Sequence, residues 1–406
     1  MDFTRFKQTK TQRGFNYAYY FTPASPGKPT LFLAHGFPTP AYLWHKQIAF
    51  LEPLGFGILA PDLLGYAGTD KPTDPKAYVG SGLAQDIVDI LDKEGIEKVV
   101  AIGHDWGVQV VSRLLNYHPD RIIGAAVLAV CYLPPIPVGT DMTLVLKEKL
   151  GYDVYAYQRF FVEPGAHLLI EKNFDAFFSM FFPLPKSDTQ PENIVRDHMC
   201  VEGKAKAWVE ENRVTELVSY ITPEDKQYFK ETLLAGGMQG PLAWYKVFLS
   251  GDGSADDAKI SKEAAMITKP LLFIGFNNDP ICRPEVGYEM HAAYVQPQSN
   301  ITNKVVDGDH WALLSHSDET PDETTYTTMG AYGEAKAALI LTAIAISRRS
   351  GGKILGFSLH PGIINTNINN HPDALPLLKS LGVMTDDGQP NTKDFQWKTL
   401  GQGAAT

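Results

Sequence analysis

The sequence predicts an α/β protein whose largely parallel sheet is interrupted by a mostly helical segment. Short apolar runs alternate with helix-like stretches over residues 10–134, and such alternation is typical of parallel strands joined by helices. The proline-rich run Pro134-Pro135-Ile136-Pro137 then ends the alternation, and an aromatic, mostly helical stretch follows to about Lys262. Strand-like runs resume at Leu271, so we expect the later strands to complete the same sheet.

Each element of this prediction has its own signal in the chain. Strand-like apolar runs lie at 15–21, 31–34, 57–60, 99–102, 125–130, 269–275 and 304–306, and residues 108–117 have the pattern of a helix. We therefore expect four parts: a first core part at 1–134, a helical cap at 135–262, a second core part at 263–319, and a C-terminal fragment of different character at 320–406.

The most informative motif is Gly103-His104-Asp105-Trp106-Gly107, which lies between the strand at 99–102 and the helix at 108–117. This strand, turn and helix predict a nucleophile elbow, in which a strained turn presents the attacking side chain and glycines avoid clashes. The attacking position holds Asp105. A carboxylate is already anionic, and its attack on a saturated carbon gives an ester that water can cleave, whereas attack on a carbonyl gives a labile anhydride. The alternative is a buried aspartate bonded by backbone amides.

A second motif is placed to stabilise negative charge beside the elbow. The strand at 31–34 ends in His35-Gly36-Phe37-Pro38, a pattern typical of the loop that supplies one oxyanion-hole amide, here that of Phe37. The second amide would be that of Trp106, directly after Asp105. Pro38 favours an extended conformation at Phe37, which helps to direct its N–H. The motif alone is a common turn, but its position before an aspartate elbow makes it specific.

The remaining members of a catalytic triad follow in the chain order nucleophile, acid, histidine. Asp279 comes after the strand at 269–275 and is our candidate for the orienting carboxylate. His310 lies in Asp307-Gly308-Asp309-His310-Trp311, after the strand at 304–306, and is our candidate base. For both residues the alternative is a loop position with a solvated side chain. The other histidines weighed, at positions 35, 45, 104, 118 and 316, belong to motif backbones or lack a strand-end setting.

With HGFP, GHDWG and GDHW in this order, residues 1 to about 319 resemble the soluble epoxide hydrolase family of the α/β-hydrolase fold. The resemblance implies that two cap tyrosines donate hydrogen bonds to the epoxide oxygen. The local patterns YQRFFVEPG and GPLAWYK match the family there and nominate Tyr157 and Tyr245, with Tyr152 and Tyr155 as competitors for the first. It also implies a reaction that needs no metal and no organic cofactor.

A dehalogenase is the main alternative within this fold, because it shares the aspartate elbow. Haloalkane dehalogenases typically place an asparagine or a second tryptophan near the HGxP loop to bind halide, and this chain has Phe37 there. Fluoroacetate-type enzymes need arginines near the nucleophile, and the residue after Asp105 is Trp106. The cap tyrosines favour an epoxide as the substrate.

Composition excludes some classes of partner. The net charge of −10 argues against a nucleic-acid-binding face, which would need clustered lysine and arginine. The three cysteines, Cys131, Cys200 and Cys282, lack metal-binding or redox spacing and fit reduced thiols in the cytosol, so we expect a cytoplasmic protein. No apolar run reaches membrane-spanning length, and the aromatic stretch 174–183 is read as cap core or pocket wall. The aromatic cap predicts a small apolar epoxide as substrate, together with water.

The chain departs from the epoxide hydrolase pattern after residue 319. Residues 320–406 resemble the C-terminal part of a short-chain dehydrogenase/reductase, with Tyr332 and Lys336 at the positions of its proton donor and lysine. The motifs 359–366 and 402–405 extend the likeness. The glycine-rich dinucleotide loop and the catalytic serine are missing, so we expect a truncated Rossmann-type fragment without reductase activity. A second hypothesis follows: a non-catalytic fusion product, compromised by the lost last hydrolase helix.

Overall fold

The computed structural model describes residues 1–188, 190–315, 363–364, 385 and 397–398. The chain divides into two compact units, Met1–Asp318 and Glu319–Thr406. In the second unit, β9 (Ile363–Ile364) pairs in parallel with β10 (Trp397–Lys398). The predicted reductase-like motifs around Tyr332 and Lys336 and at 402–405, and most of the one at 359–366, lie outside the described residues.

The first unit is built on an eight-stranded sheet with the strand order β1-β2-β4-β3-β5-β6-β7-β8. The six strands from β4 to β8 in this order are parallel, as the alternating pattern predicts. Their bounds are β3 Thr30–Ala34, β4 Gly57–Pro61, β5 Val99–His104, β6 Ile122–Leu128, β7 Leu271–Phe276 and β8 Ile301–Val306. β6 begins and ends earlier than the strand predicted at 125–130. It ends at Leu128 because the chain turns at Ala129, where φ is +62°.

The edge of the sheet differs from the prediction. β2 (Asn16–Thr22) is antiparallel to both β4 and β1 (Phe6–Lys10), and the sequence pattern did not reveal β1. β1 has the sequence FKQTK and no fully buried residue, so it lacks the apolar alternation that marks a strand. By contrast, every residue of β3, β4 and β5 is buried, which is typical of parallel strands covered on both faces.

Helices flank the sheet. α2 buries Leu83, Ile87 and Leu91, a spacing of four residues that places one apolar face against the core. The helices that connect strands are α1 (His45–Leu51), α2 (Gly80–Lys93), α3 (Gly107–Tyr117) and α12 (Pro284–Tyr294), with α13 (Ala312–Ser315) after β8. Single turns lie at Phe3–Arg5, Ala41–Trp44, Glu52–Leu54, Pro75–Tyr78, Pro119–Arg121 and Gln298–Asn300. Among the described residues, no helix combines the length and the apolar character needed to cross a bilayer.

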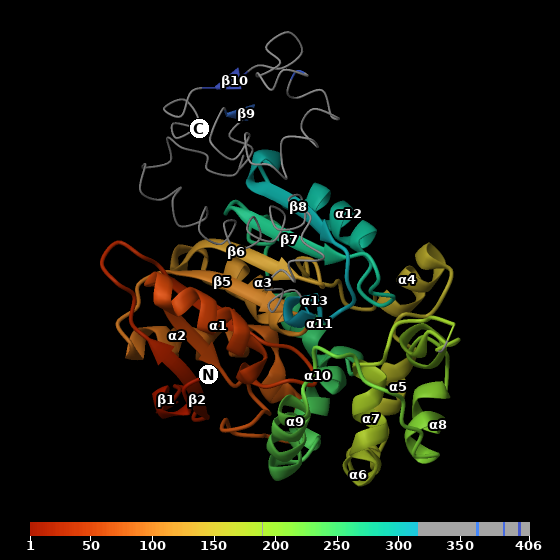
Figure 1. Cartoon of the computed structure of the whole chain (residues 1–406). Coiled ribbons are helices and arrows are strands. Elements are labelled where there is room, and N and C mark those ends of the chain that lie inside the picture. Colours follow the sequence, from red (N-terminus) through yellow and green to blue (C-terminus); the bar gives the residue numbers. More distant parts are fainter. Residues whose placement is uncertain (189, 316–362, 365–384, 386–396, 399–406) are drawn as a thin grey trace. The chain divides into compact units, whose positions relative to one another are not determined.

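A helical insertion, residues 142–257, lies between β6 and β7, where the sequence predicts a cap. Its helices are α4 (Met142–Leu150), α5 (Ala156–Val162), α6 (Ala166–Lys172), α7 (Phe174–Phe181), α8 (Lys204–Glu210), α9 (Pro223–Gly236), α10 (Gln239–Leu249) and α11 (Asp252–Asp257), with a π-helix at Val195–Met199. Figure 1 shows most of these helices gathered to one side of the sheet. The aromatic stretch on α7 buries Phe174, Phe177 and Phe178. The division into core and cap parts stays a prediction.

A buried ion pair joins the end of the insertion to the helix that follows the elbow. The guanidinium of Arg113 on α3 donates through Nε and Nη2 to the Asp257 carboxylate at 2.7 and 2.5 Å, and through Nη1 to the carbonyl of Leu133 at 2.7 Å. Both charged side chains are almost fully buried. Such a pair adds little net stability, but removing one partner leaves the other charge buried without compensation.

We therefore expect Arg113→Met to lower the free energy of unfolding by about 3–5 kcal/mol, because Asp257 loses its buried counter-ion. Urea denaturation of the full chain measures this loss. Lys226→Met is the matched control: it removes a partly exposed partner of Asp175, which keeps Lys230, so its effect should stay below about 1 kcal/mol. Equal losses in the two variants would contradict the prediction.

Candidate active site

Asp105 lies at a sharp turn between β5 and α3, as the elbow motif predicts. Its φ is +52°, a conformation that residues other than glycine rarely adopt. The flanking glycines are required by close backbone approach. A Cβ on Gly103 would lie 2.7 Å from the carbonyl oxygen of Gly107, and one on Gly107 would lie 2.1 Å from that of Ala34. The turn therefore packs directly against the end of β3.

The loop after β3 contacts the Asp105 carboxylate. The backbone N–H of Phe37 donates to Oδ1 of Asp105 at 2.8 Å, so this predicted amide is aimed at the carboxylate. A Cβ at Gly36 would lie 2.3 Å from the Asp105 Cβ, which explains why a glycine occupies that position. Trp106 packs its ring 5.3 Å from that of Tyr245, and its role as a second amide donor stays a prediction.

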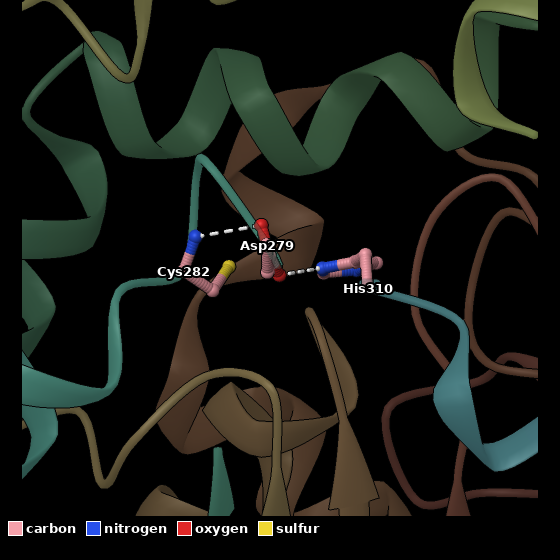
Figure 2. Close-up of side chains that lie close together, drawn as sticks. All are labelled: Asp279, Cys282 and His310. Carbon is pink, nitrogen blue, oxygen red and sulfur yellow. Dashed lines mark hydrogen bonds and ion pairs between the residues drawn. The ribbon is translucent and has the colours of Figure 1, made fainter. Parts of the chain in front are cut away.

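The predicted acid and base are brought together at the ends of β7 and β8. His310 Nδ1 lies 2.6 Å from Asp279 Oδ2, and the other oxygen of Asp279 accepts the backbone N–H of Cys282 (Figure 2). The same oxygen also accepts the backbone N–H of Ile281. The His310 Nε2 atom lies 3.6 Å from Asp105 Oδ2. A proton on Nδ1 bonded to Asp279 leaves Nε2 facing Asp105, so the three residues form a continuous chain of contacts.

The electrostatics of these groups are coupled. Burial alone lowers the pKa of His310, but the charge of Asp279 and the hydrogen bonds with Asp105 and Asp279 raise this pKa well above its usual value. Burial raises the pKa of Asp105 and of Asp279, yet the contacts with His310 outweigh it and both pKa values are lowered. An imidazolium between two carboxylates is therefore favoured when no ligand is bound.

Asp105, Asp279 and His310 line a cavity of about 600 Å³ together with the two predicted tyrosines. Tyr157 on α5 and Tyr245 on α10 line it together with Asp105, Phe37 and His310. The tyrosines are only 7% and 2% exposed, and their ring centroids lie 5.9 Å apart. Burial raises the pKa of both phenols well above the usual value, and nearby groups that include Asp105 raise it further. Both are therefore neutral hydroxyls that can donate a hydrogen bond.

The two competing tyrosines have other environments. Tyr152 also lines the cavity, but its hydroxyl donates to the carbonyl of Pro280 at 2.5 Å. Tyr155 packs its ring against Phe248 and is not among the residues that line the cavity. The hydroxyl oxygen of Tyr157 accepts a long contact of 3.4 Å from the Gln158 amide. The geometry therefore favours Tyr157 as the partner of Tyr245.

Asp279, Cys282 and His310 have donor atoms within 4.8 Å of one another. In the described part of the chain, they are the one group of side chains close enough together to be considered as metal ligands. The 2.6 Å separation of His310 Nδ1 from Asp279 Oδ2 fits a hydrogen bond. Two ligands of one tetrahedral zinc ion, with bonds of about 2.0 Å, would lie about 3.3 Å apart. Burial also raises the pKa of the Cys282 thiol, which disfavours the thiolate that binds metals. The arrangement fits acid–base chemistry better than ion binding.

A family model described as the alpha/beta hydrolase fold matches residues 29–317. The chain belongs to this alpha/beta hydrolase family. The match spans β3 to the histidine loop and so includes Asp105, Asp279 and His310. The predicted α/β-hydrolase fold is thereby confirmed for the first unit.

Individual relatives of this hydrolase are named epoxide hydrolases. The chain is 31% identical over 265 residues to bifunctional epoxide hydrolase 2 of Rattus norvegicus, a match that covers 64% of this chain and 45% of the relative. It is 32% identical over 257 residues to epoxide hydrolase A of Mycobacterium tuberculosis, covering 63% and 77%. The crystal structure of epoxide hydrolase A from Mycobacterium thermoresistibile is similar with a TM-score of 0.62 and 28% identity, covering 79% of this chain and 95% of that one. The chain thus spans less than half of the rat relative's length.

Sequence reasoning missed several contacts that hold His310 in this hydrolase. His104 Nε2 lies 2.8 Å from the His310 carbonyl, and burial, followed by the charge of His310, lowers the pKa of His104 to about 3, so it is a neutral donor. Tyr220 donates to Asp309 at 2.7 Å, and Trp311 Nε1 donates to the carbonyl of Phe181 at the same distance. His104 could be suspected from its place beside Asp105. Tyr220 has no local signal, because its partner lies 89 residues away.

The coupling between His310 and Asp105 gives a prediction about pH. Replacing Asp105 by asparagine removes a negative charge 3.6 Å from Nε2, so the pKa of His310 should fall toward its usual value while Asp279 still holds it up. Histidine ¹⁵N NMR titration of the full chain measures this change. Asp120→Asn, at an exposed turn, is the control and should leave the pKa unchanged. An identical His310 pKa in wild type and Asp105→Asn would refute the coupling.

Proposed function

We propose that this hydrolase converts an epoxide and water into a vicinal diol, with Asp105 as the nucleophile. The arrangement that supports this proposal is a carboxylate at a strained turn that shares one cavity with two buried, neutral tyrosine hydroxyls. A carboxylate suits displacement at a saturated carbon, and phenols suit an oxygen that gains charge as the ring opens. Relatives named epoxide hydrolases point in the same direction.

In the first step, Oδ2 of Asp105 attacks one ring carbon of the epoxide. The carbon–oxygen bond breaks, and the leaving oxygen takes hydrogen bonds and then a proton from the pair Tyr157 and Tyr245. The product is a hydroxyalkyl ester on Asp105. The Phe37 amide holds Oδ1 at 2.8 Å, which leaves the other carboxylate oxygen to act as the nucleophile.

In the second step, water cleaves this ester. Forming the ester removes the charge of Asp105, so the pKa of His310 falls. The Nε2 proton of His310 passes to the tyrosine that was deprotonated in the first step, which restores the phenol and leaves Nε2 free to take a proton from water. The hydroxide attacks the ester carbonyl, and the amides of Phe37 and Trp106 stabilise the oxyanion. The imidazolium of His310 then protonates the departing alkoxide, which leaves as the diol. The new carboxylic acid of Asp105 gives its proton to Nε2 of His310, which restores the carboxylate and the imidazolium.

The remaining alternatives differ in what they need from the site. A haloalkane dehalogenase needs donors for a departing halide, and the cavity presents the Phe37 ring where that family places such a donor. A compromised fusion product would hydrolyse no epoxide at all. A panel of styrene oxide, a long-chain epoxide and 1-chlorobutane separates these alternatives, because each predicts turnover of a different member or of none.

The ester intermediate provides the direct test of the mechanism. With His310→Gln, the first step should proceed and the second should stall, so mass spectrometry of the intact chain should find an alkyl adduct on Asp105. A single wild-type turnover in ¹⁸O-water should place the label in the enzyme carboxylate and not in the first diol. Asp105→Ala should form no diol, while Asp120→Ala should keep wild-type activity. Turnover without any adduct or carboxylate label would exclude Asp105 as the nucleophile.

The tyrosine pair gives a separate prediction. Tyr157→Phe and Tyr245→Phe should each lower the alkylation rate about 10- to 100-fold, because one hydrogen bond to developing negative charge is lost. Stopped-flow quenching of tryptophan fluorescence during ester formation measures that rate. Tyr155→Phe is the matched control and should react at the wild-type rate. A larger loss in Tyr155→Phe than in Tyr157→Phe would show that Tyr155, and not Tyr157, donates to the epoxide oxygen.

A further inference from the structure

The cavity is not purely apolar. Besides Asp105 and the tyrosines, three cationic side chains line it: Lys186, Arg196 and Arg283. Two of them, Lys186 and Arg196, belong to the helical insertion, and Arg283 follows the loop of Asp279. This charge distribution differs from the expectation of an uncharged apolar substrate.

Within the described residues, the carboxylates that line the cavity form no ion pair with these cations. Asp279 bonds His310, and Asp309 accepts from Tyr220. Arg283 has its own partner, because it pairs with Glu285 at 2.8 Å. Arg196 has none: within the part of the chain that the structure describes, no carboxylate lies within ion-pair distance of its guanidinium, and no protein group accepts its side-chain N–H groups.

The guanidinium of Arg196 is nevertheless held in place. Its Cζ lies 3.4 Å from the centroid of the Tyr152 ring, and the Tyr152 hydroxyl donates to the carbonyl of Pro280, next to Asp279. A guanidinium stacked on an aromatic ring keeps the N–H groups along its edge available for a ligand. Arg196 also lies on the π-helix Val195–Met199, a rare conformation that occurs frequently at functional sites.

A positioned arginine with free donors is suited to bind a carboxylate or a phosphate through two parallel hydrogen bonds. We infer that Arg196 is a specificity-determining residue that selects epoxides carrying an anionic group, with the ring at Asp105 and the anion at Arg196. The inference rests on the proposed function and names its substrate class. Lys186 adds positive charge to the same cavity, and the rings of Phe37 and Phe181 contact the apolar part of the substrate.

Matched substrates test this inference. Terminal epoxides with alkyl spacers of increasing length are prepared as the free carboxylate, the methyl ester and the phosphate ester. At one spacer length, wild type should prefer an anion over the neutral ester by about tenfold or more in kcat/KM. Arg196→Met should abolish this preference by lowering kcat/KM for the anion about tenfold or more and far more than for the ester, and Arg196→Lys should restore part of it. Comparing carboxylate with phosphate identifies which anion is bound.

Arg213→Met is the matched control. Arg213 also lies on the insertion and stacks on an aromatic ring, with Cζ 4.3 Å from the centroid of Trp208, but it does not line the cavity. Its loss should leave the preference for anions intact. Equal kcat/KM for anion and ester in wild type, or an equal loss for both in Arg196→Met, would overturn the inference.

A binding measurement separates this inference from the proposed function. Calorimetric titration of the full chain with decanoate and with decanamide needs no reaction. Decanoate should bind more tightly to wild type by about tenfold, an advantage that falls with added salt and disappears in Arg196→Met. Equal affinities for decanoate and decanamide would overturn the inference that Arg196 binds an anion. Binding of decanoate with no turnover of any epoxide would refute the proposed function alone.

Discussion

The position of the His310 imidazole between the carboxylates of Asp279 and Asp105 is the constraint on which the rest of the site depends. These three residues follow β8, β7 and β5, so their contacts require the parallel register of the sheet. The strained turn at Asp105 is tolerated because glycines let β3 and the elbow approach closely and because the Phe37 amide binds the carboxylate. The sheet and its loops thus position the proposed nucleophile and the proposed base.

The insertion nevertheless contacts the residues on both sides of the base. Tyr220 binds Asp309, and the indole of Trp311 binds the carbonyl of Phe181. The same insertion supplies Tyr157 and Tyr245, which line the same cavity as Asp105. Movement of the insertion relative to the sheet would therefore change the position of the proposed donors and the contacts beside His310 together.

The sequence predicted the parts of this site that are encoded locally. Asp105, Phe37 and His310 each lie in a short motif at the end of an apolar run, and strand ends meet at one edge of a parallel sheet. The sequence nominated Tyr157 over Tyr152 and Tyr155 only through a local match to the family. The residues alone could not decide, because the choice depends on which side chains line the cavity and on the bond from Tyr152 to Pro280. The edge strand β1 was missed because its residues are largely exposed, and the free guanidinium of Arg196 was missed because it depends on partners distant in sequence.

The charge balance between Asp105 and His310 links the two steps of the proposed reaction, alkylation and ester hydrolysis. An anionic substrate that approaches Asp105 would meet like charge, but the imidazolium of His310 and the cations of the cavity offset that repulsion. Alkylation then removes the charge of Asp105 while Asp279 keeps the His310 ring oriented. The same histidine therefore balances the nucleophile's charge before ring opening and acts as a base after it. A serine at the elbow could not supply this change, because its neutral hydroxyl has no charge to lose when it is esterified.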